Sequence, residues 1–200
     1  MTTRPHALQA FVSALQNALS SRAGLPEEQT MLSRSFEALA RPRDSRQAAG
    51  QRLPACRHLD SIAARAQSFP EDLHRLARLF FALEPSLVWR QRSGSMDGAS
   101  DSFAEGHANA LIVGPGGLER RTDVSVGVTI LAPHVRYPDH THPPEETYLI
   151  LSPGRFSHDL QEAVEPGLGG TFYNAPGIVH SMESGNEPLF AFWILGSQER

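Results

Sequence analysis

Two histidine-bearing segments constrain this chain more than any other feature, because together they supply four side chains that bind metal ions. His140, His142 and Glu146 follow an H-x-H-x3-E spacing, and His180 lies in a second segment further along. Residues two apart on a β-strand point to the same face, so the first two imidazoles can meet at one point. A proline pair after His142 lets Glu146 turn toward them. The fold must therefore bring both segments together around one metal ion.

Three imidazoles and a carboxylate suit one divalent transition metal: iron, manganese, cobalt, nickel or zinc. The sequence does not choose among these ions. Glu145 is a second candidate carboxylate, but on a strand it faces away from its neighbour, so Glu146 is the predicted ligand. His134 is a candidate to support a ligand without binding the metal itself, and His158 is predicted to lie on the surface.

Residues 1–90 are predicted to be helical. Apolar residues recur there at helical spacing, which predicts about four helices, near residues 8–19, 26–40, 59–66 and 70–84. Small, polar and glycine residues follow at 91–107. This segment is either a flexible linker or a lid loop over a site.

From about residue 108 to residue 200 the pattern changes to strands. Short runs of β-branched and aromatic residues alternate with Gly and Pro turns, and the expected strands lie near residues 110–113, 124–131, 148–151, 169–173, 178–182 and 188–195. The predicted fold class is therefore mainly β, a small sandwich or barrel, with a helical amino-terminal part.

Composition excludes several classes of function. All 18 basic residues are Arg, and without a lysine the chain has no Schiff-base or pyridoxal phosphate chemistry. The arginines are spread along the chain, so nucleic acid is not an expected partner. No apolar run approaches the roughly 20 residues of a membrane span, and the amino terminus lacks the apolar core of a signal peptide. Cys56 is the only cysteine, which fits a reducing cytoplasm as the expected location.

The two histidine segments resemble the two motifs of the cupins. Gly170 and Pro176 keep the spacing of the second cupin motif, although one residue of the motif is missing before His180. His134 occupies the position where the first motif has a glycine. The resemblance implies a single cupin, jelly-roll-like β-barrel over residues 108–200, in which the four side chains above bind the metal.

A narrower resemblance rests on two tyrosines. Tyr148 lies two residues after Glu146, and Tyr137 lies three residues before His140. With the helical part and the total length, these residues are similar to the cupin-type dimethylsulfoniopropionate (DMSP) lyases of the Q type. That resemblance implies a metal-dependent lyase that cleaves DMSP to dimethyl sulfide and acrylate by base-initiated β-elimination. It also implies that Tyr148 is the base and that Tyr137 lies in the substrate pocket.

A small zwitterionic sulfonium substrate needs a cation site without a hydrogen-bond acceptor, and aromatic faces provide one. Tyr137, Tyr173 and Trp193 are the predicted substrate-binding aromatics. Phe190 and Phe192 are predicted to belong to the core instead.

Two other functions stay open on the sequence alone. The ligands do not set the reaction, so another cupin metalloenzyme, a non-haem dioxygenase or an isomerase, fits them as well. A non-enzymatic ligand-sensing cupin is the second alternative. The helical part is expected to pack beside the barrel mouth, where it could also form a homodimer contact.

Overall fold

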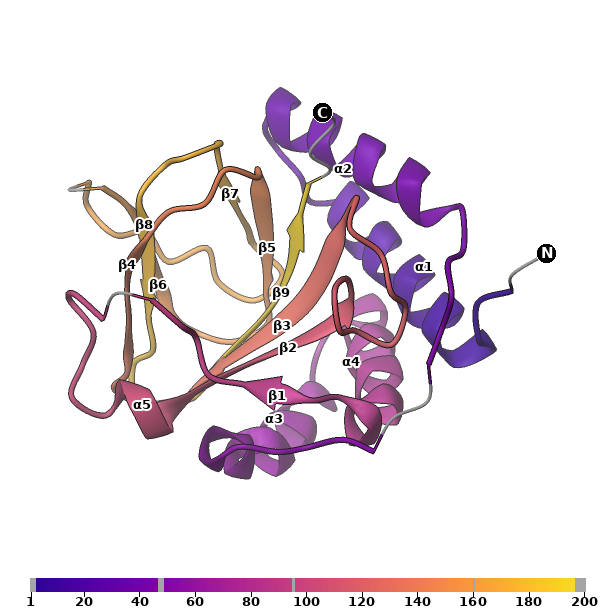
Figure 1. Ribbon diagram of the computed structural model, residues 1–200. Helices are drawn as coiled ribbons and strands as arrows, with labels where there is room; N and C mark the ends of the chain where they lie inside the picture. The colour runs from indigo at the N-terminus through magenta and orange to yellow at the C-terminus, as the bar shows by residue number, and fades with distance from the viewer. Residues whose placement is uncertain (1–2, 47–48, 95, 160, 197–200) are drawn as a thin grey trace.

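The computed structural model describes residues 3–46, 49–94, 96–159 and 161–196. Within them the chain forms two antiparallel β-sheets, with helices packed against the larger sheet (Figure 1). The predicted fold class, mainly β with a helical amino-terminal part, is confirmed. Among the described residues, no helix is both long enough and apolar enough to cross a membrane.

The four predicted helices are α1 (His6–Ser20), α2 (Pro26–Leu39), α3 (Leu59–Ala66) and α4 (Glu71–Leu83). Each buries the apolar stripe that its helical spacing creates. α2 begins with a proline and two glutamates, whose charges suit the positive end of the helix dipole. Three short helical elements were not predicted: the 3-10 helices η1 (Pro54–His58) and η2 (Glu84–Ser86), and the single turn α5 (Phe103–Gly106).

The strands form a six-stranded sheet in the order β1-β2-β3-β9-β5-β7 and a three-stranded sheet in the order β4-β8-β6. Their bounds are β1 (Trp89–Arg90), β2 (His107–Val113), β3 (Ser125–Leu131), β4 (Arg136–His140), β5 (Glu146–Ile150), β6 (Arg155–His158), β7 (Thr171–Asn174), β8 (His180–Glu183) and β9 (Leu189–Leu195). The six predicted strands correspond to β2, β3, β5, β7, β8 and β9. β1 has only two residues, and β4 contains a proline, which is tolerated because β4 lies at a sheet edge.

The helices pack against the six-stranded sheet, and α2 reaches the turn before β5, where Arg34 pairs with Glu145 at 2.7 Å. The expected position of the helices beside the barrel mouth stays a prediction. Phe192 of β9 packs on Phe11 of α1, with ring centres 5.3 Å apart, and Phe190 packs on Phe80 of α4 at 5.4 Å. These rings belong to a hydrophobic cluster that joins helix and sheet residues. Trp193 alternates with them and packs against a second cluster, between the two sheets.

The segment 91–107 is attached to β4 through Arg136. The backbone N–H of Ser100 donates to the carbonyl of Arg136 at 3.3 Å, and the Arg136 N–H donates to Oγ of Ser100 at 3.2 Å. The ring of Phe103 also stacks on His107, with centres 3.7 Å apart. A lid role for this segment, like the division at residues 90 and 107, stays a prediction. The predicted ranges include residues 1–2, 47–48, 95, 160 and 197–200, which lie outside the described part of the chain.

A buried ionic cluster ties the amino-terminal segment to the sheet region. Nε of Arg4 donates to Glu119 at 2.6 Å, and Nη1 of Arg121 donates to the same carboxylate at 2.9 Å. The Glu119 side chain is fully buried. Arg121 also pairs with Asp123, whose side chain is exposed at the edge of the cluster. Since both arginines share one buried carboxylate, Glu119 is the residue on which this junction depends.

Candidate metal centre

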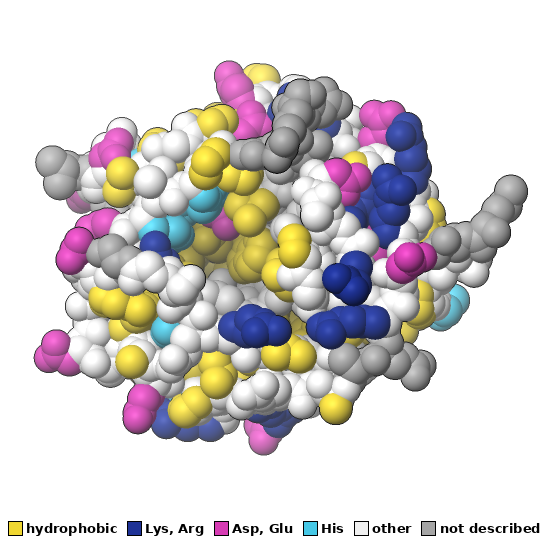
Figure 2. All heavy atoms as spheres, in the orientation of Figure 1, with side chains coloured by type: hydrophobic (Ala, Val, Ile, Leu, Met, Phe, Trp, Pro, Cys, Tyr) yellow, Lys and Arg dark blue, Asp and Glu magenta, His cyan; other side chains and the backbone are white. Residues whose placement is uncertain are grey.

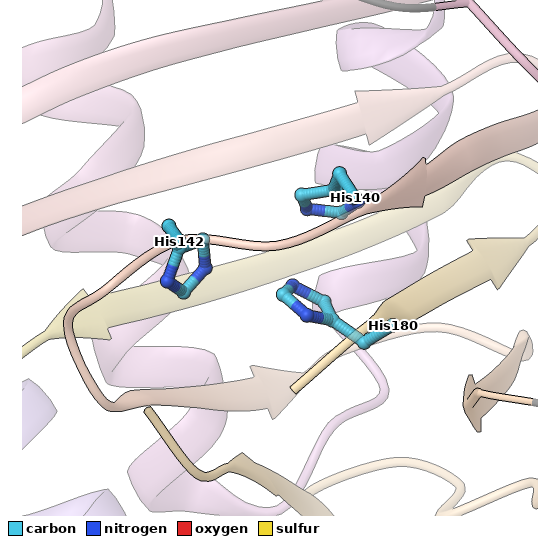
Figure 3. Close-up of side chains that lie close together, drawn as sticks. All are labelled: His140, His142 and His180. Carbon is cyan, nitrogen blue, oxygen red and sulfur yellow. The ribbon is translucent and has the colours of Figure 1, made fainter. Parts of the chain in front are cut away.

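Three histidines from separate segments converge between the sheets. His140 ends β4, His180 begins β8, and His142 lies in the turn 141–145 before β5. One nitrogen from each ring lies within 4.8 Å of one from each of the others, and Figure 3 shows the three imidazoles gathered at one point. His142 reaches this point from a turn, so the expectation that it shares a strand face with His140 is wrong.

Each imidazole is oriented by a backbone carbonyl two residues away. Nδ1 of His140 is 2.9 Å from the Pro138 carbonyl, and Nδ1 of His142 is 2.8 Å from the Pro144 carbonyl. The third contact, between His180 and Ile178, is 3.1 Å. A carbonyl only accepts, so each Nδ1 carries the proton and donates. Each Nε2 is then the nitrogen available to a metal, in the arrangement typical of metal-binding histidines.

Glu146 lies beside the three rings at the start of β5. Its Oε2 is 3.2 Å from Nε2 of His142 and 3.2 Å from Nε2 of His180. Ligand atoms about 2.0–2.1 Å from one ion lie roughly 3.3 Å apart in a tetrahedral site, so these spacings fit a shared metal. Glu145 points to the helices instead, where it pairs with Arg34 at 2.7 Å. The structure therefore brings together all four predicted ligands.

The charges at the centre favour a bound cation. Burial works against ionisation of Glu146, but the imidazoles of His142 and His180 lower its pKa to about 2. Burial, together with repulsion from His180, lowers the pKa of His140 to about 4. For His142 the Glu146 carboxylate outweighs burial and raises the pKa above its usual value. A proton on Nε2 of His142 therefore occupies a position that a metal would take.

His180 supports the fit of a metal independently. Its side chain is 2% exposed, and its Nε2 has no hydrogen-bond partner of acceptable geometry among the described residues, although Glu146 is close. A buried nitrogen lone pair without a partner is costly, and a bound cation would satisfy it. The donor set, three imidazoles and one carboxylate, suits a divalent transition metal.

Both predicted catalytic tyrosines lie at the centre. Tyr148 is on β5, two residues from Glu146 and on the same strand face, and is 3% exposed. Burial, with a further contribution from Glu146, raises the pKa of the Tyr148 phenol well above 10. The ring of Tyr137 lies 4.9 Å from that of His140, and burial raises the pKa of its phenol to about 12. In the metal-free chain both phenols are therefore protonated at neutral pH.

A line of hydrogen bonds connects Tyr137 to Trp193. Nε1 of Trp193 donates to Thr129 at 3.1 Å, and the Thr129 hydroxyl donates to Oδ1 of Asn109 at 2.6 Å. Asn109 in turn donates from Nδ2 to the Tyr137 hydroxyl at 3.1 Å. The guanidinium carbon of Arg92 lies 5.7 Å from the centre of the Tyr137 ring. Asn109 and Thr129 were not predicted, because their partners lie far from them in the sequence.

The predicted aromatics divide between the two faces of the sheet. Trp193 pairs with Tyr148 across β9 and β5, so both side chains are on the face that carries Glu146. Tyr173 pairs with Thr147 and packs against the helical cluster, where its hydroxyl donates to Glu145 at 3.2 Å. The structure thus places Tyr173 on the opposite face of the sheet from the centre, and the expectation that it binds substrate is not kept.

Two other histidines, His158 and His134, lie in environments that differ from those predicted. His158, predicted to be a surface residue, is half-buried and lies 2.8 Å from the side chain of Asn174, which was not predicted. His134 is exposed in a turn with φ 59°, a left-handed conformation that favours glycine and explains why the cupin motif has glycine there. The expectation that His134 supports a ligand is therefore wrong. Cys56 is buried, and burial raises the pKa of its thiol, which disfavours the reactive thiolate form.

On the face shown in Figure 2, histidine side chains border a hollow lined largely by hydrophobic side chains. Two β-sheets that enclose three convergent histidines define a cupin-type protein with a group of residues able to bind a metal. A sequence model of the dimethylsulfoniopropionate lyase family matches residues 27–191. The chain therefore belongs to the DMSP lyase family and is a carbon–sulfur lyase acting on a small molecule.

Solved structures agree with this fold. A chain from the crystal structures of the DMSP lyases RdDddP and RnDddQII has 22% sequence identity and a TM-score of 0.69, over 96% of this chain and 93% of that one. DMSP lyase DddQ from Ruegeria pomeroyi DSS-3 has 18% identity and a TM-score of 0.68, over 98% and 93% of the two chains. A search of curated proteins found no match.

Proposed function

We propose that the chain cleaves DMSP to dimethyl sulfide and acrylate at this centre, with one divalent metal held by His140, His142, His180 and Glu146. The observation that carries the proposal is the convergence of the three histidines, two of which place Nε2 3.2 Å from Oε2 of Glu146, with a buried tyrosine two residues away on the same face. A metal bound there supplies Lewis-acid stabilisation of a substrate carboxylate and lowers the pKa of a nearby phenol.

Tyr148 is the proposed base. Its phenolate takes the proton from the carbon next to the substrate carboxylate, and the released electron pair forms the new double bond. The C–S bond breaks, and its electron pair leaves on sulfur as neutral dimethyl sulfide. The charges balance, because a zwitterion and a phenolate give a neutral sulfide, acrylate and a neutral phenol. No general acid is needed for this leaving group.

The sulfonium end of the substrate is proposed to lie against aromatic faces. Trp193 is next to Tyr148 on the same sheet face, and Tyr137 lies beside His140. Each cation–π contact contributes about 0.5–2 kcal/mol, and neither ring offers the sulfonium an unwanted nucleophile. Burial and the hydrogen bond from Asn109 hold the Tyr137 ring in place. A cytoplasmic location and a homodimer stay predictions.

The test is dimethyl sulfide release from purified protein, stripped of metal and then given Fe²⁺, Mn²⁺, Co²⁺, Ni²⁺ or Zn²⁺ separately. We expect release only with metal, and none in the chelated control. Tyr148→Phe should keep the metal and lose at least about 100-fold in kcat. Tyr173→Phe is the matched control, because that tyrosine lies on the opposite sheet face. Equal turnover by the Tyr148→Phe variant would refute the base assignment.

A further inference from the structure

The carboxylate of Glu146 is held by a second line of hydrogen bonds that runs away from the metal centre. Nδ2 of Asn174 is 2.9 Å from Oε2 of Glu146, and Nε2 of His158 is 2.8 Å from Oδ1 of Asn174. Asn174 is completely buried and Glu146 is 4% exposed. Water therefore cannot replace a lost hydrogen-bond partner of the Glu146 carboxylate or of the Asn174 amide.

The direction of these bonds follows from their chemistry. A carboxylate only accepts hydrogen bonds, so the amide nitrogen of Asn174 must face Glu146. The amide oxygen then faces His158, whose Nε2 must carry a proton and donate. His158 thereby determines which end of the Asn174 amide meets the carboxylate.

Three strands from both sheets place these residues. Asn174 on β7 lies directly opposite Glu146 on β5, in the larger sheet. His158 on β6 lies opposite His180 on β8, in the smaller sheet. The His158 ring also stacks on Phe172, with centres 4.3 Å apart and planes 26° apart, which fixes its orientation. The line of hydrogen bonds thus joins the two sheets beside the metal centre.

We propose that His158 and Asn174 are positioning residues that set the metal affinity of the centre by fixing the Glu146 carboxylate. The inference rests on the proposed metal centre but not on the proposed reaction. Without the His158 donor, the Asn174 amide can rotate and bring its oxygen against Oε2 of Glu146. That contact would repel the carboxylate from the position it holds beside His142 and His180. Loss of such outer partners weakens metal binding by about 10–100-fold.

The test is the dissociation constant for Zn²⁺ and Co²⁺, measured by competition with a chromophoric chelator. His158→Phe keeps an aromatic ring to stack on Phe172 but removes the donor, and we expect its affinity to fall at least about tenfold. His158→Gln can donate from its amide, and we expect it to recover most of the wild-type affinity. His6→Phe, at an exposed histidine at the start of α1, is the control and should bind as wild type does.

The two His158 variants distinguish a hydrogen-bond donor from a ring that only packs. Wild-type affinity in a folded His158→Phe variant overturns the proposal, and so does a folded His158→Gln variant that binds as weakly as the Phe variant. If His158→Phe does not fold, the Gln variant alone decides, because recovery of both fold and affinity requires the donor. A wild-type protein that binds no metal also overturns the proposal. Failure to release dimethyl sulfide from a protein that binds metal refutes only the proposed reaction.

Discussion

The indole of Trp193 lies directly on Gly127, which makes that glycine a sharp test of the proposed substrate pocket. A Cβ added at Gly127 would be 2.2 Å from Cζ2 and 2.5 Å from Cη2 of Trp193. Ordinary carbon contacts are about 3.5–4.0 Å, so in Gly127→Ala the ring must move by roughly 1.5 Å. That movement separates Nε1 from Thr129, the acceptor 3.1 Å away.

The magnitude follows from these contacts. Overpacking costs about 1–3 kcal/mol, and the lost hydrogen bond adds about 1 kcal/mol, for a total of roughly 2–4 kcal/mol. With an unfolding entropy of about 0.4 kcal/mol/K for a chain of this length, the melting temperature should fall by about 5–10 °C. Displacing the indole face also removes a cation–π contact of about 0.5–2 kcal/mol, so KM for DMSP should rise roughly 2- to 30-fold.

Thermal unfolding and initial rates of dimethyl sulfide release measure the two effects. Gly185→Ala is the matched control, because a Cβ there meets no atom within 4 Å and the backbone is not left-handed. A Gly127→Ala protein that melts within about 1 °C of wild type would show that the indole does not lie on the glycine. A destabilised protein with an unchanged KM would instead remove Trp193 from the pocket.

Three further predictions concern the centre and the scaffold. His180→Ala should bind no stoichiometric metal by elemental analysis, and retained metal would refute the ligand set. Metal affinity should fall about tenfold per pH unit below the pKa of His142, which the Glu146 carboxylate raises above its usual value, because the metal must displace that proton. An affinity independent of pH between 5 and 7 would contradict this. Glu119→Ala leaves buried Arg4 without a carboxylate and Arg121 with Asp123 as its carboxylate partner, and should cost about 3–5 kcal/mol in thermal or denaturant unfolding. Glu37→Ala, which breaks an exposed pair, should cost less than about 0.5 kcal/mol, and equal losses in the two variants would refute the role of burial.

The helices and the longer strands were predictable because their signals are local. Helical spacing of apolar residues located α1 to α4, a run rich in β-branched residues located β3, and a run of aromatic and aliphatic residues located β9. β1, β4 and β6 were missed because none of them contains a β-branched residue, and β4 also contains a proline.

In the candidate site too, the residues with a local sequence signal were predicted and those that depend on long-range contacts were not. Ligand spacing indicated His140, His142, Glu146 and His180, but the roles of Asn174 and His158 depend on strand pairings that no spacing reveals. The assignment of Tyr173 failed for a related reason. Alternation says that neighbours on a strand face opposite ways, but only the register with β5 says which neighbour faces the centre.

The backbone contacts of the three histidines have a consequence for how such a centre can change over evolution. Each ring takes its proton position from a carbonyl two residues away in its own segment, at Pro138, Pro144 and Ile178. Each short segment therefore determines by itself which nitrogen its histidine offers to a metal. The rest of the fold only brings the segments together. Distant substitutions can reshape the pocket, and with it the substrate, without altering which nitrogen each histidine offers. A centre built this way can keep offering the same nitrogens to a metal while the surrounding residues diverge.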